Sequence, residues 1–240
     1  MSGTQILRHG RSEEVLAGLR QANIDCVLTD PPYGVDNQSN SAVTKAGKEH
    51  ARKIANDSSP EEALAVFAKV MNIILPKMKP SSDIYIFTAQ EVLKEWLIFC
   101  DELFAPSGFE RKSVGTWIKA GPGMGDLEGW GRGYEFILYY QRGRKERGIK
   151  RRNMVLEFLQ NPPAKLIHPH EKPLALLETL IKHSTREGDW IVDPFAGSGS
   201  TLRAAQRCNR NALGVEFDKL NYDKALYALE QGDGGGFDFE

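Results

Sequence analysis

The chain has 240 residues, of which 41% are hydrophobic and 26% are charged, and its formal net charge is −1. These values are ordinary for a soluble globular protein with one sizeable core, and they exclude a nucleic-acid binder that is basic overall. The three widely separated cysteines argue against a disulfide framework and a zinc site. No membrane-length apolar run or signal peptide is visible, so we expect a cytoplasmic protein with no membrane partner and no metal.

The hydrophobic pattern predicts strands that alternate with helices. In chain order, we predict a strand at 5–8, a helix at 12–20, a strand at 24–29, a helix at 60–75, a strand at 83–88, a helix at 91–103, strands at 114–119 and 134–140, a helix at 173–183, a strand at 190–193, a helix at 202–207 and a strand at 213–218. This alternation predicts an α/β fold with a doubly wound, mostly parallel sheet.

Candidate catalytic residues follow the strand at 24–29. Pro31 and Pro32 offer no N–H to a sheet, so the strand must end at Asp30, close to the ring of Tyr33. Ligands of parallel α/β sheets bind at this end of the strands. A carboxylate and a proline carbonyl accept hydrogen bonds and the ring suits a flat partner, so the exocyclic amine of a nucleobase fits this group. The alternative interpretation is a turn that simply uses Asp and Pro.

A glycine-rich turn follows the strand at 190–193. Gly197 and Gly199 remove side chains where the backbone turns and where a ligand must come close, and the N–H groups of the next helix favour an anion. The next strand ends in Glu216, an acid at a spacing that is common for ribose recognition. The pattern indicates a nucleoside cofactor with a small anionic group. No Gly-Lys-Ser/Thr follows the turn, which argues against a phosphate-binding P-loop.

Four segments in this order resemble the beta arrangement of the amino-group DNA methyltransferases, and the resemblance covers residues 5–228. They are Asp30-Pro31-Pro32-Tyr33, the strand 133–140, His168-Pro169-His170-Glu171-Lys172-Pro173, and Asp193-Pro194-Phe195-Ala196-Gly197-Ser198-Gly199. The resemblance implies a Rossmann-like sheet of seven strands, mostly parallel with one antiparallel strand, in a circularly permuted motif order. It also implies S-adenosylmethionine as cofactor, with S-adenosylhomocysteine as product.

The resemblance assigns roles to particular residues of this chain. The implied catalytic residues, which would hold the amine of a flipped-out base, are Asp30, Pro31, Pro32 and Tyr33. The implied cofactor-binding residues are Asp193, Phe195, Ala196, Gly197, Ser198, Gly199, Ser200, Thr201, Glu216, Phe217 and, at the methionine end, Lys172. The family usually places an acid near the cofactor adenine where this chain has Arg11, and Ser12 or Glu13 are alternative partners for that ring.

A basic segment occupies the place of the family's target-recognition segment, here 141–167. Its first part, 141–152, holds seven basic side chains and one acid. Phosphate contacts position a protein without reading sequence, so we expect salt-sensitive DNA binding and a short or loose target. The alternative is a solvated surface. The candidate DNA-binding residues are Arg142, Arg144, Lys145, Arg147, Lys150, Arg151 and Arg152.

The residue type at Asp30 favours one reaction. In the family, Asp at this place mostly accompanies methylation of adenine N6, and Ser often accompanies cytosine N4. We therefore predict a site-specific DNA adenine-N6 methyltransferase, with cytosine N4 as the alternative. RNA and protein amide methyltransferases usually have Asn here. A further alternative is an inactive subunit that binds DNA or cofactor, against which the intact Asp30, Tyr33, Gly197 and Glu216 argue.

We predict one catalytic domain over 1–230, with an active-site loop at 34–58 and a disordered acidic tail at 231–240. Besides DNA, a homodimer partner and a cognate restriction endonuclease are candidate partners. The resemblance places the protein in the cytoplasm of a bacterial or phage-infected cell.

Overall fold

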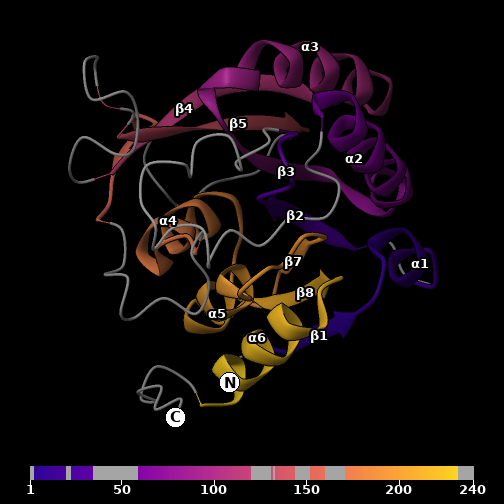
Figure 1. Cartoon of the computed structure of the whole chain (residues 1–240), viewed down its shortest axis with the longest axis vertical. Helices are drawn as coiled ribbons and strands as arrows, with labels where there is room; N and C mark the ends of the chain where they lie inside the picture. Colours follow the sequence, from indigo (N-terminus) through magenta and orange to yellow (C-terminus); the bar gives the residue numbers. More distant parts are fainter. Residues whose placement is uncertain are drawn as a thin grey trace, which may run out of the picture.

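The computed structural model is built around one eight-stranded sheet with helices on both faces (Figure 1). The structure describes residues 3–19, 23–34, 59–119, 131, 133–143, 152–159 and 171–231. This arrangement confirms the predicted doubly wound α/β fold. Within the described ranges, no helix has the length and apolar character needed to cross a membrane.

The strand order in the sheet is β1-β8-β7-β2-β3-β5-β4-β6. The strands are β1 (Gln5–His9), β2 (Ile24–Thr29), β3 (Met78–Thr88), β4 (Glu110–Ile118), β5 (Tyr134–Arg142), β6 (Val155–Glu157), β7 (Trp190–Asp193) and β8 (Asn211–Glu216). β5 runs antiparallel to its neighbours β3 and β4, and the other neighbouring pairs are parallel. The one antiparallel strand is therefore confirmed.

The sheet contains one strand more than the seven that were expected. The additional strand is β6, which pairs in parallel with the end of β4 and places Leu156 beside Trp117. Three residues are too few for an alternating pattern, so the sequence alone did not indicate this strand. The indole N–H of Trp117 donates to the carbonyl of Phe158 at 2.9 Å and fixes the chain just beyond β6. β6 lies within 141–167, the predicted target-recognition segment.

The helices form two layers. Helices α1 (Ser12–Ala17), α2 (Pro60–Ile74) and α3 (Leu93–Phe104) cover one face of the sheet, and α4 (Leu174–Ser184), α5 (Ser200–Arg207) and α6 (Lys219–Gln231) cover the other (Figure 1). Helix α2 begins at the predicted place, where the Ser59 side chain accepts a hydrogen bond from the backbone N–H of Glu62 at 3.2 Å. Helix α6 was not predicted, because few of its side chains are buried to give a clear apolar stripe.

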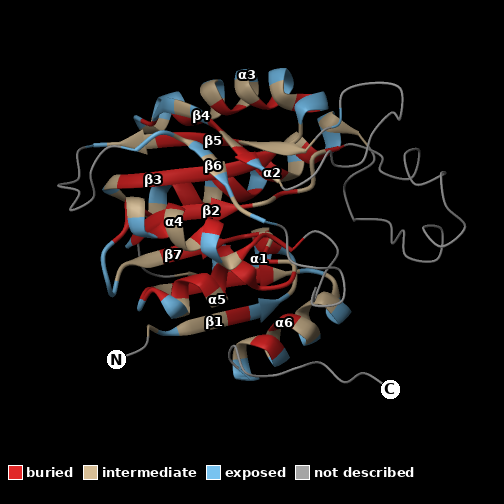
Figure 2. Ribbon diagram, turned by 90° about the vertical axis from the view of Figure 1, so that its left-hand side faces the viewer, coloured by how far each residue is buried: buried red, intermediate tan, exposed pale blue. Residues whose placement is uncertain are grey.

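Side chains of the central strands are divided between two hydrophobic cores, and the ribbon of these strands is largely coloured as buried in Figure 2. On the α2 and α3 side, Trp96 is fully buried and its ring lies edge-on to Phe67, with centroids 5.0 Å apart. On the α4 side, Tyr85 stacks on Tyr139 with centroids 4.7 Å apart. β2, β7 and residues 82–88 of β3 are almost entirely buried, so helices cover both faces of the sheet where these strands reach their carboxyl ends.

The sheet reverses its winding between β2 and β7. From β2 the chain continues to β3 on one side, and from β7 it continues to β8 on the other, although β2 and β7 are direct neighbours. Open α/β sheets bind ligands outside the carboxyl ends of the strands at such a switch point. Asp30 follows β2 and Asp193 ends β7, so both carboxyl groups belong to this place.

Arg142 lies at the opposite edge of the sheet from Asp30. It pairs with Ser82 near the start of β3, and its guanidinium donates to the carbonyls of Ser107, Met78 and Lys79 at 2.7 to 3.0 Å. Three of the five N–H donors of the Arg142 guanidinium are used by backbone carbonyls, so this arrangement leaves fewer donors for a phosphate than the predicted DNA contact would use. β5 runs antiparallel to β3 and so places Arg142 far from Asp30. A run of basic residues in the sequence does not indicate this direction.

Replacement of Arg142 separates the structural role from DNA binding. Arg142→Ala leaves up to three carbonyls without their donor, so we expect the free energy of unfolding to fall by about 1–3 kcal/mol. Arg142→Lys keeps the charge but cannot span the three carbonyls, so most of this loss should remain. Denaturant unfolding measures the loss, and fluorescence anisotropy with a DNA duplex should show unchanged affinity for both variants. Unchanged stability with weakened DNA binding would contradict this role.

Candidate active site

The carboxylate of Asp30 is held from two sides at the carboxyl edge of the sheet. The hydroxyl of Tyr33 donates to Oδ1, and Nζ of Lys172 donates to Oδ2 at 2.6 Å. The Lys172 side chain is 7% exposed and that of Asp30 is 28% exposed, so the cation is enclosed while the carboxylate still reaches solvent. An exposed carboxylate beside a buried cation can accept hydrogen bonds from an incoming donor.

The ring of Tyr33 is fixed by α3. Trp96 lies edge-on to this ring, with centroids 6.5 Å apart, and its indole N–H donates to the Tyr33 carbonyl at 3.4 Å. Pro31 is buried and Pro32 half-buried, so the segment after β2 is anchored along its length. The Pro-Pro pair therefore ends the strand and presents Asp30 and Tyr33 together.

The Asp193 carboxylate joins the glycine turn to β2. It is buried, and its Oδ1 accepts from the Thr29 hydroxyl at 2.9 Å and from the backbone N–H of Phe195 at 3.1 Å. Burial raises the pKa of Asp193 to about 6, against the opposite effect of hydrogen bonds from Thr201, Thr29 and the Phe195 backbone. This carboxyl group fixes the start of the turn from the side of β2.

The glycine turn is open on its outer side. Gly197 has φ +51° and Gly199 has φ +72°, backbone conformations that glycine adopts without strain. A Cβ at Gly197 would meet no heavy atom of the described residues within 4 Å. Gly199 is the residue before α5, whose first two residues, Ser200 and Thr201, are buried. The turn thus leaves room beside its backbone at the start of a helix.

Glu216 links the end of β8 to the glycine turn. Its Oε2 accepts from the backbone N–H of Gly197 at 2.8 Å, and its Oε1 accepts from the backbone N–H of Asp218 at 2.7 Å. Burial raises the pKa of Glu216 above its ordinary value. The next side chain, Phe217, is 53% exposed, and the guanidinium of Arg11 lies 5.3 Å from its ring centroid. An acid, an exposed ring and an open turn therefore lie next to one another.

The structure gathers the predicted catalytic and cofactor-binding residues at one edge. Ala196 and Ser198 are buried within the turn, and Phe195 is half-buried against the α2 core, with its ring 6.4 Å from that of Phe67. Lys172 was expected at the methionine end of the cofactor, whereas here its ammonium group is bonded to Asp30.

The predicted DNA-binding segment is described only in part. Arg152 is exposed. Arg144, Lys145, Arg147, Lys150 and Arg151 lie outside the described residues, as do the loop at 35–58 and the tail at 232–240. Among the described residues, no group of three His, Cys, Asp or Glu side chains is arranged to hold a metal ion.

Two charged residues of this edge, Glu135 and Lys119, were not predicted from the sequence. Glu135, the second residue of β5, carries an ion pair with Lys172 at 3.0 Å and another with Lys119, the residue after β4. An acid inside the apolar run at 134–140 was a detectable signal, because a carboxylate is rarely buried without a partner. Its partner could not be found from the sequence, since Lys172 lies on a distant segment.

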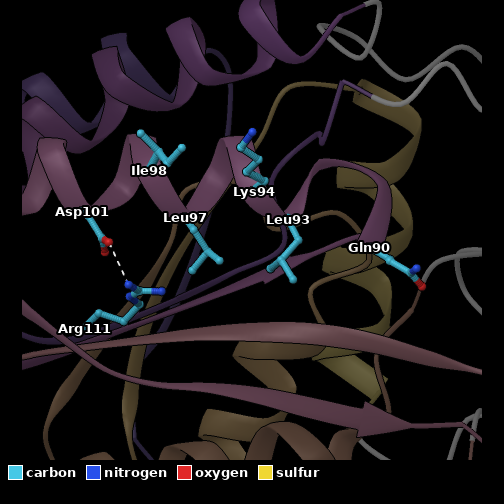
Figure 3. A pocket seen from close by; sticks show the side chains of 7 residues that line it. All are labelled: Gln90, Leu93, Lys94, Leu97, Ile98, Asp101 and Arg111. Carbon is cyan, nitrogen blue, oxygen red and sulfur yellow. Dashed lines mark ion pairs between the residues drawn. The ribbon is translucent and has the colours of Figure 1, made fainter.

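A separate hollow of about 470 Å³ lies between α3 and β4, lined from Gln90, just after β3, to Asp101 (Figure 3). Leu93, Leu97 and Ile98 line it, and Arg111 crosses it to pair with Asp101 at 3.0 Å. The site at the ends of β2 and β7 does not include this hollow.

Comparison with known proteins identifies the family. The sequence model of the N6/N4 DNA methylase family matches residues 24–226. The chain belongs to this family and is an N6/N4 DNA methyltransferase. Family membership confirms the resemblance seen in the sequence, and S-adenosylmethionine is the cofactor.

Individual relatives agree with this assignment. The chain is 26% identical to the Type II methyltransferase M2.DpnII of Streptococcus pneumoniae, over 94% of this chain and 89% of that protein. It is 27% identical to the Type II methyltransferase M.HpaI of Haemophilus parainfluenzae, over 94% of this chain and 74% of that protein.

Solved structures share the fold. The M1.HpyAVI–S-adenosylmethionine complex superposes with a TM-score of 0.69 at 22% identity, over 94% of this chain and 99% of that one. The cytosine-N4-specific PvuII DNA methyltransferase gives a TM-score of 0.71 at 16% identity, over 95% and 86%. At these identities the similarity shows the fold alone.

The raised pKa of Asp193 predicts a pH effect on stability. The folded state holds the Asp193 proton more tightly than the unfolded state, so this group destabilises the fold as pH rises from about 4 to above 6. Asp193→Asn keeps the acceptor oxygen and removes the charge. Without cofactor, the variant should be more stable than the wild type at pH 8, by on the order of 2–3 kcal/mol, and equally stable near pH 3. Denaturant unfolding at several pH values tests this, and a constant difference would contradict it.

Proposed function

We propose that this DNA methyltransferase transfers a methyl group from S-adenosylmethionine to the exocyclic N6 amine of an adenine flipped out of duplex DNA. The observation that carries the proposal is the position of the Asp30 carboxylate. It lies at the switch point, accessible to solvent, between Tyr33 and Lys172. The glycine turn begins close to Asp30, because the hydroxyl of Thr29, the residue before Asp30, donates a hydrogen bond to Asp193 at the start of the turn.

The residues at the ends of β7 and β8 fit S-adenosylmethionine. Glu216 would accept from the ribose hydroxyls and Phe217 would cover the adenine, since its ring is exposed directly beside that acid. The open backbone at Gly197 and the start of α5 would leave room for the charged methionine portion. The cofactor supplies an activated methyl group on a sulfonium.

The residues after β2 would hold the target amine. Asp30 and the carbonyl of Pro31 would accept its two N–H bonds, which draws the nitrogen towards tetrahedral geometry and stabilises the positive charge that develops on it. S-adenosylmethionine would supply the methyl group to this nitrogen and leave as S-adenosylhomocysteine, and the methylated amine would then release its extra proton to the solvent that reaches Asp30. Orientation supplies most of the help, because Asp30 need not deprotonate the amine beforehand.

The choice of adenine rests on the carboxylate at position 30. Asp at this place in the family mostly accompanies adenine N6, and the pairing of Asp30 with a buried lysine supports a carboxylate in the acceptor role. The similarity to the cytosine-N4-specific PvuII enzyme makes cytosine N4 the second candidate. Flipping costs a few kcal/mol, and stacking on Tyr33 would return about 1–3 kcal/mol.

The remaining proposals concern the surroundings of the site. We propose one catalytic domain over 1–230, the loop at 34–58 as an active-site loop, and the basic segment at 141–167, without Arg142, as the DNA-positioning segment. The Type II names of the relatives support a cognate restriction endonuclease in a bacterial or phage-infected cytoplasm. A homodimer would suit a palindromic site.

Product analysis tests the reaction. The protein is incubated with methyl-labelled S-adenosylmethionine and unmethylated duplex DNA, which is then digested to nucleosides. We expect the label in N6-methyladenosine. Label in N4-methylcytosine would overturn the choice of base and keep the reaction, and absence of label despite cofactor binding would contradict the proposal.

Removal of the carboxylate should stop transfer and spare cofactor binding. Asp30→Ala removes the acceptor for the target amine, so kcat should fall by at least about 10³-fold. Calorimetric titration should give an S-adenosylmethionine affinity within a few-fold of the wild type. Near-normal turnover in the variant would refute the role of Asp30. Asp101→Ala, at the hollow beside α3, is a matched control that should retain turnover.

The exposed ring of Phe217 should matter for the cofactor. Phe217→Ala removes the surface proposed to cover the cofactor adenine, so the dissociation constant should rise about 5- to 100-fold. The exposed Tyr227 of α6 offers a control, Tyr227→Ala, which should leave the affinity unchanged. Titration calorimetry without DNA measures both, and equal affinities for the two variants would contradict the assignment.

A further inference from the structure

Four charged side chains of alternating sign form a continuous chain behind the target site. Asp30 bonds to Lys172 at 2.6 Å, Lys172 lies 3.0 Å from Glu135, and Glu135 pairs with Lys119. They come from four places: the end of β2, the segment before α4, the start of β5 and the end of β4. Two positive and two negative charges leave the group neutral, which a half-buried cluster requires.

Lys172 is enclosed by aromatic side chains. Its ammonium lies 5.0 Å from the ring centroid of Phe87 and 6.0 Å from that of Trp117. Burial opposes its charge, but Asp30 and Glu135 raise the pKa of Lys172 above its ordinary value. This lysine therefore stays protonated and does not accept the proton that leaves the target amine. As a permanent cation it can hold the Asp30 carboxylate in place.

Glu135 is charged in spite of its burial. Burial alone would raise the pKa of Glu135, but Lys172 and Lys119 lower it below its ordinary value. The Glu135 carboxylate attracts the same Lys172 ammonium group that binds Asp30. With Glu135 present, the attraction of Lys172 is divided between two carboxylates, and Asp30 keeps acceptor strength for another donor.

We propose that Lys172 and Glu135 are positioning residues for Asp30. Lys172 fixes Oδ2 of Asp30, so that Oδ1 faces the target amine, and Glu135 weakens the bond between Lys172 and Asp30. The inference rests on the proposed function. The Tyr33 hydroxyl, which donates to Oδ1 in this structure, occupies the place of the amine and is displaced when the base enters. Lys172 thus serves the catalytic carboxylate.

Among the residues that the structure describes, the charged and titratable groups around Asp30 come from several elements. Lys172 and Tyr33 contact it directly, Asp193 of β7 lies close enough for its own carboxyl to feel the charge, and Glu135 and Lys119 stand behind Lys172. Removal of Lys172 leaves Asp30 among carboxylates. Removal of the Glu135 charge leaves it beside an undivided cation. The two changes must therefore shift the titration of Asp30 in opposite directions.

The experiment follows the carboxyl carbon of Asp30 by ¹³C NMR as pH is varied, in the protein without cofactor or DNA. The variant Asp30→Asn identifies the resonance. In Lys172→Met, whose side chain has a similar length and no charge, the midpoint should rise by about one pH unit or more. In Glu135→Gln it should fall. Lys182→Met, an exposed lysine of α4, is the matched control and should leave the midpoint unchanged.

Activity gives a second readout with the same signs. The acidic limb of the kcat profile should move with the Asp30 midpoint in each variant, while the dissociation constant for S-adenosylmethionine stays within about threefold. Lys172→Arg, which keeps the charge, should keep the midpoint near that of the wild type if Lys172→Met does not fold. An unmoved midpoint in folded Lys172→Met, or a midpoint that does not fall in Glu135→Gln, would overturn the inference. Neither result bears on the proposed function, which the labelled product of the wild-type protein tests separately.

Discussion

The adjacency of β2 and β7 is the constraint on which the site depends. These strands are far apart in the sequence, yet they pair in parallel and end at the same edge. The Thr29 hydroxyl donates to the buried Asp193 carboxyl and so ties the two ends together. Every other group of the site is placed relative to this pair. Asp30 and Tyr33 extend from β2, and the glycine turn extends from β7 towards Glu216.

This arrangement divides the site into two halves with different physical requirements. The proposed cofactor half contains backbone N–H groups, an open glycine turn and one acid, which suit a charged nucleoside. The proposed catalytic half needs a carboxylate that is oriented and still able to accept a new donor. A buried lysine meets the first need, and the partial exposure of Asp30 meets the second. Glu135 affects both requirements, because it forms an ion pair with the same lysine that binds Asp30.

The sequence predicted those parts of the site that belong to single segments. Two prolines after a buried strand located Asp30, and glycines between a strand and a helix located the turn, since both patterns reflect the local backbone. The fold class followed from the alternation of strands and helices. Strand β6 escaped prediction because three residues give no alternating pattern, and helix α6 escaped it because few of its side chains are buried.

Side-chain partners across long sequence distances could not be predicted. The sequence placed Lys172 with the cofactor, whereas 142 residues separate it from Asp30, the carboxylate it binds. Arg142 was grouped with the basic segment by its neighbours in the chain, yet the direction of β5 carries it to the far edge of the sheet. In both cases the partner lies on a segment that only the tertiary fold brings close, which local patterns do not reveal.

The proposed mechanism requires that Asp30 receives the target amine on Oδ1 while Lys172 holds Oδ2. A crystal structure of the protein with a duplex containing its target site and a non-reactive analogue of the cofactor measures this directly. We expect the exocyclic nitrogen of a flipped adenine about 2.7–3.2 Å from Asp30 Oδ1, with the Tyr33 hydroxyl displaced and the bond from Lys172 to Oδ2 intact. A flipped base whose amine lies away from Asp30, or a Lys172 that has left Asp30 for the cofactor, would contradict the account.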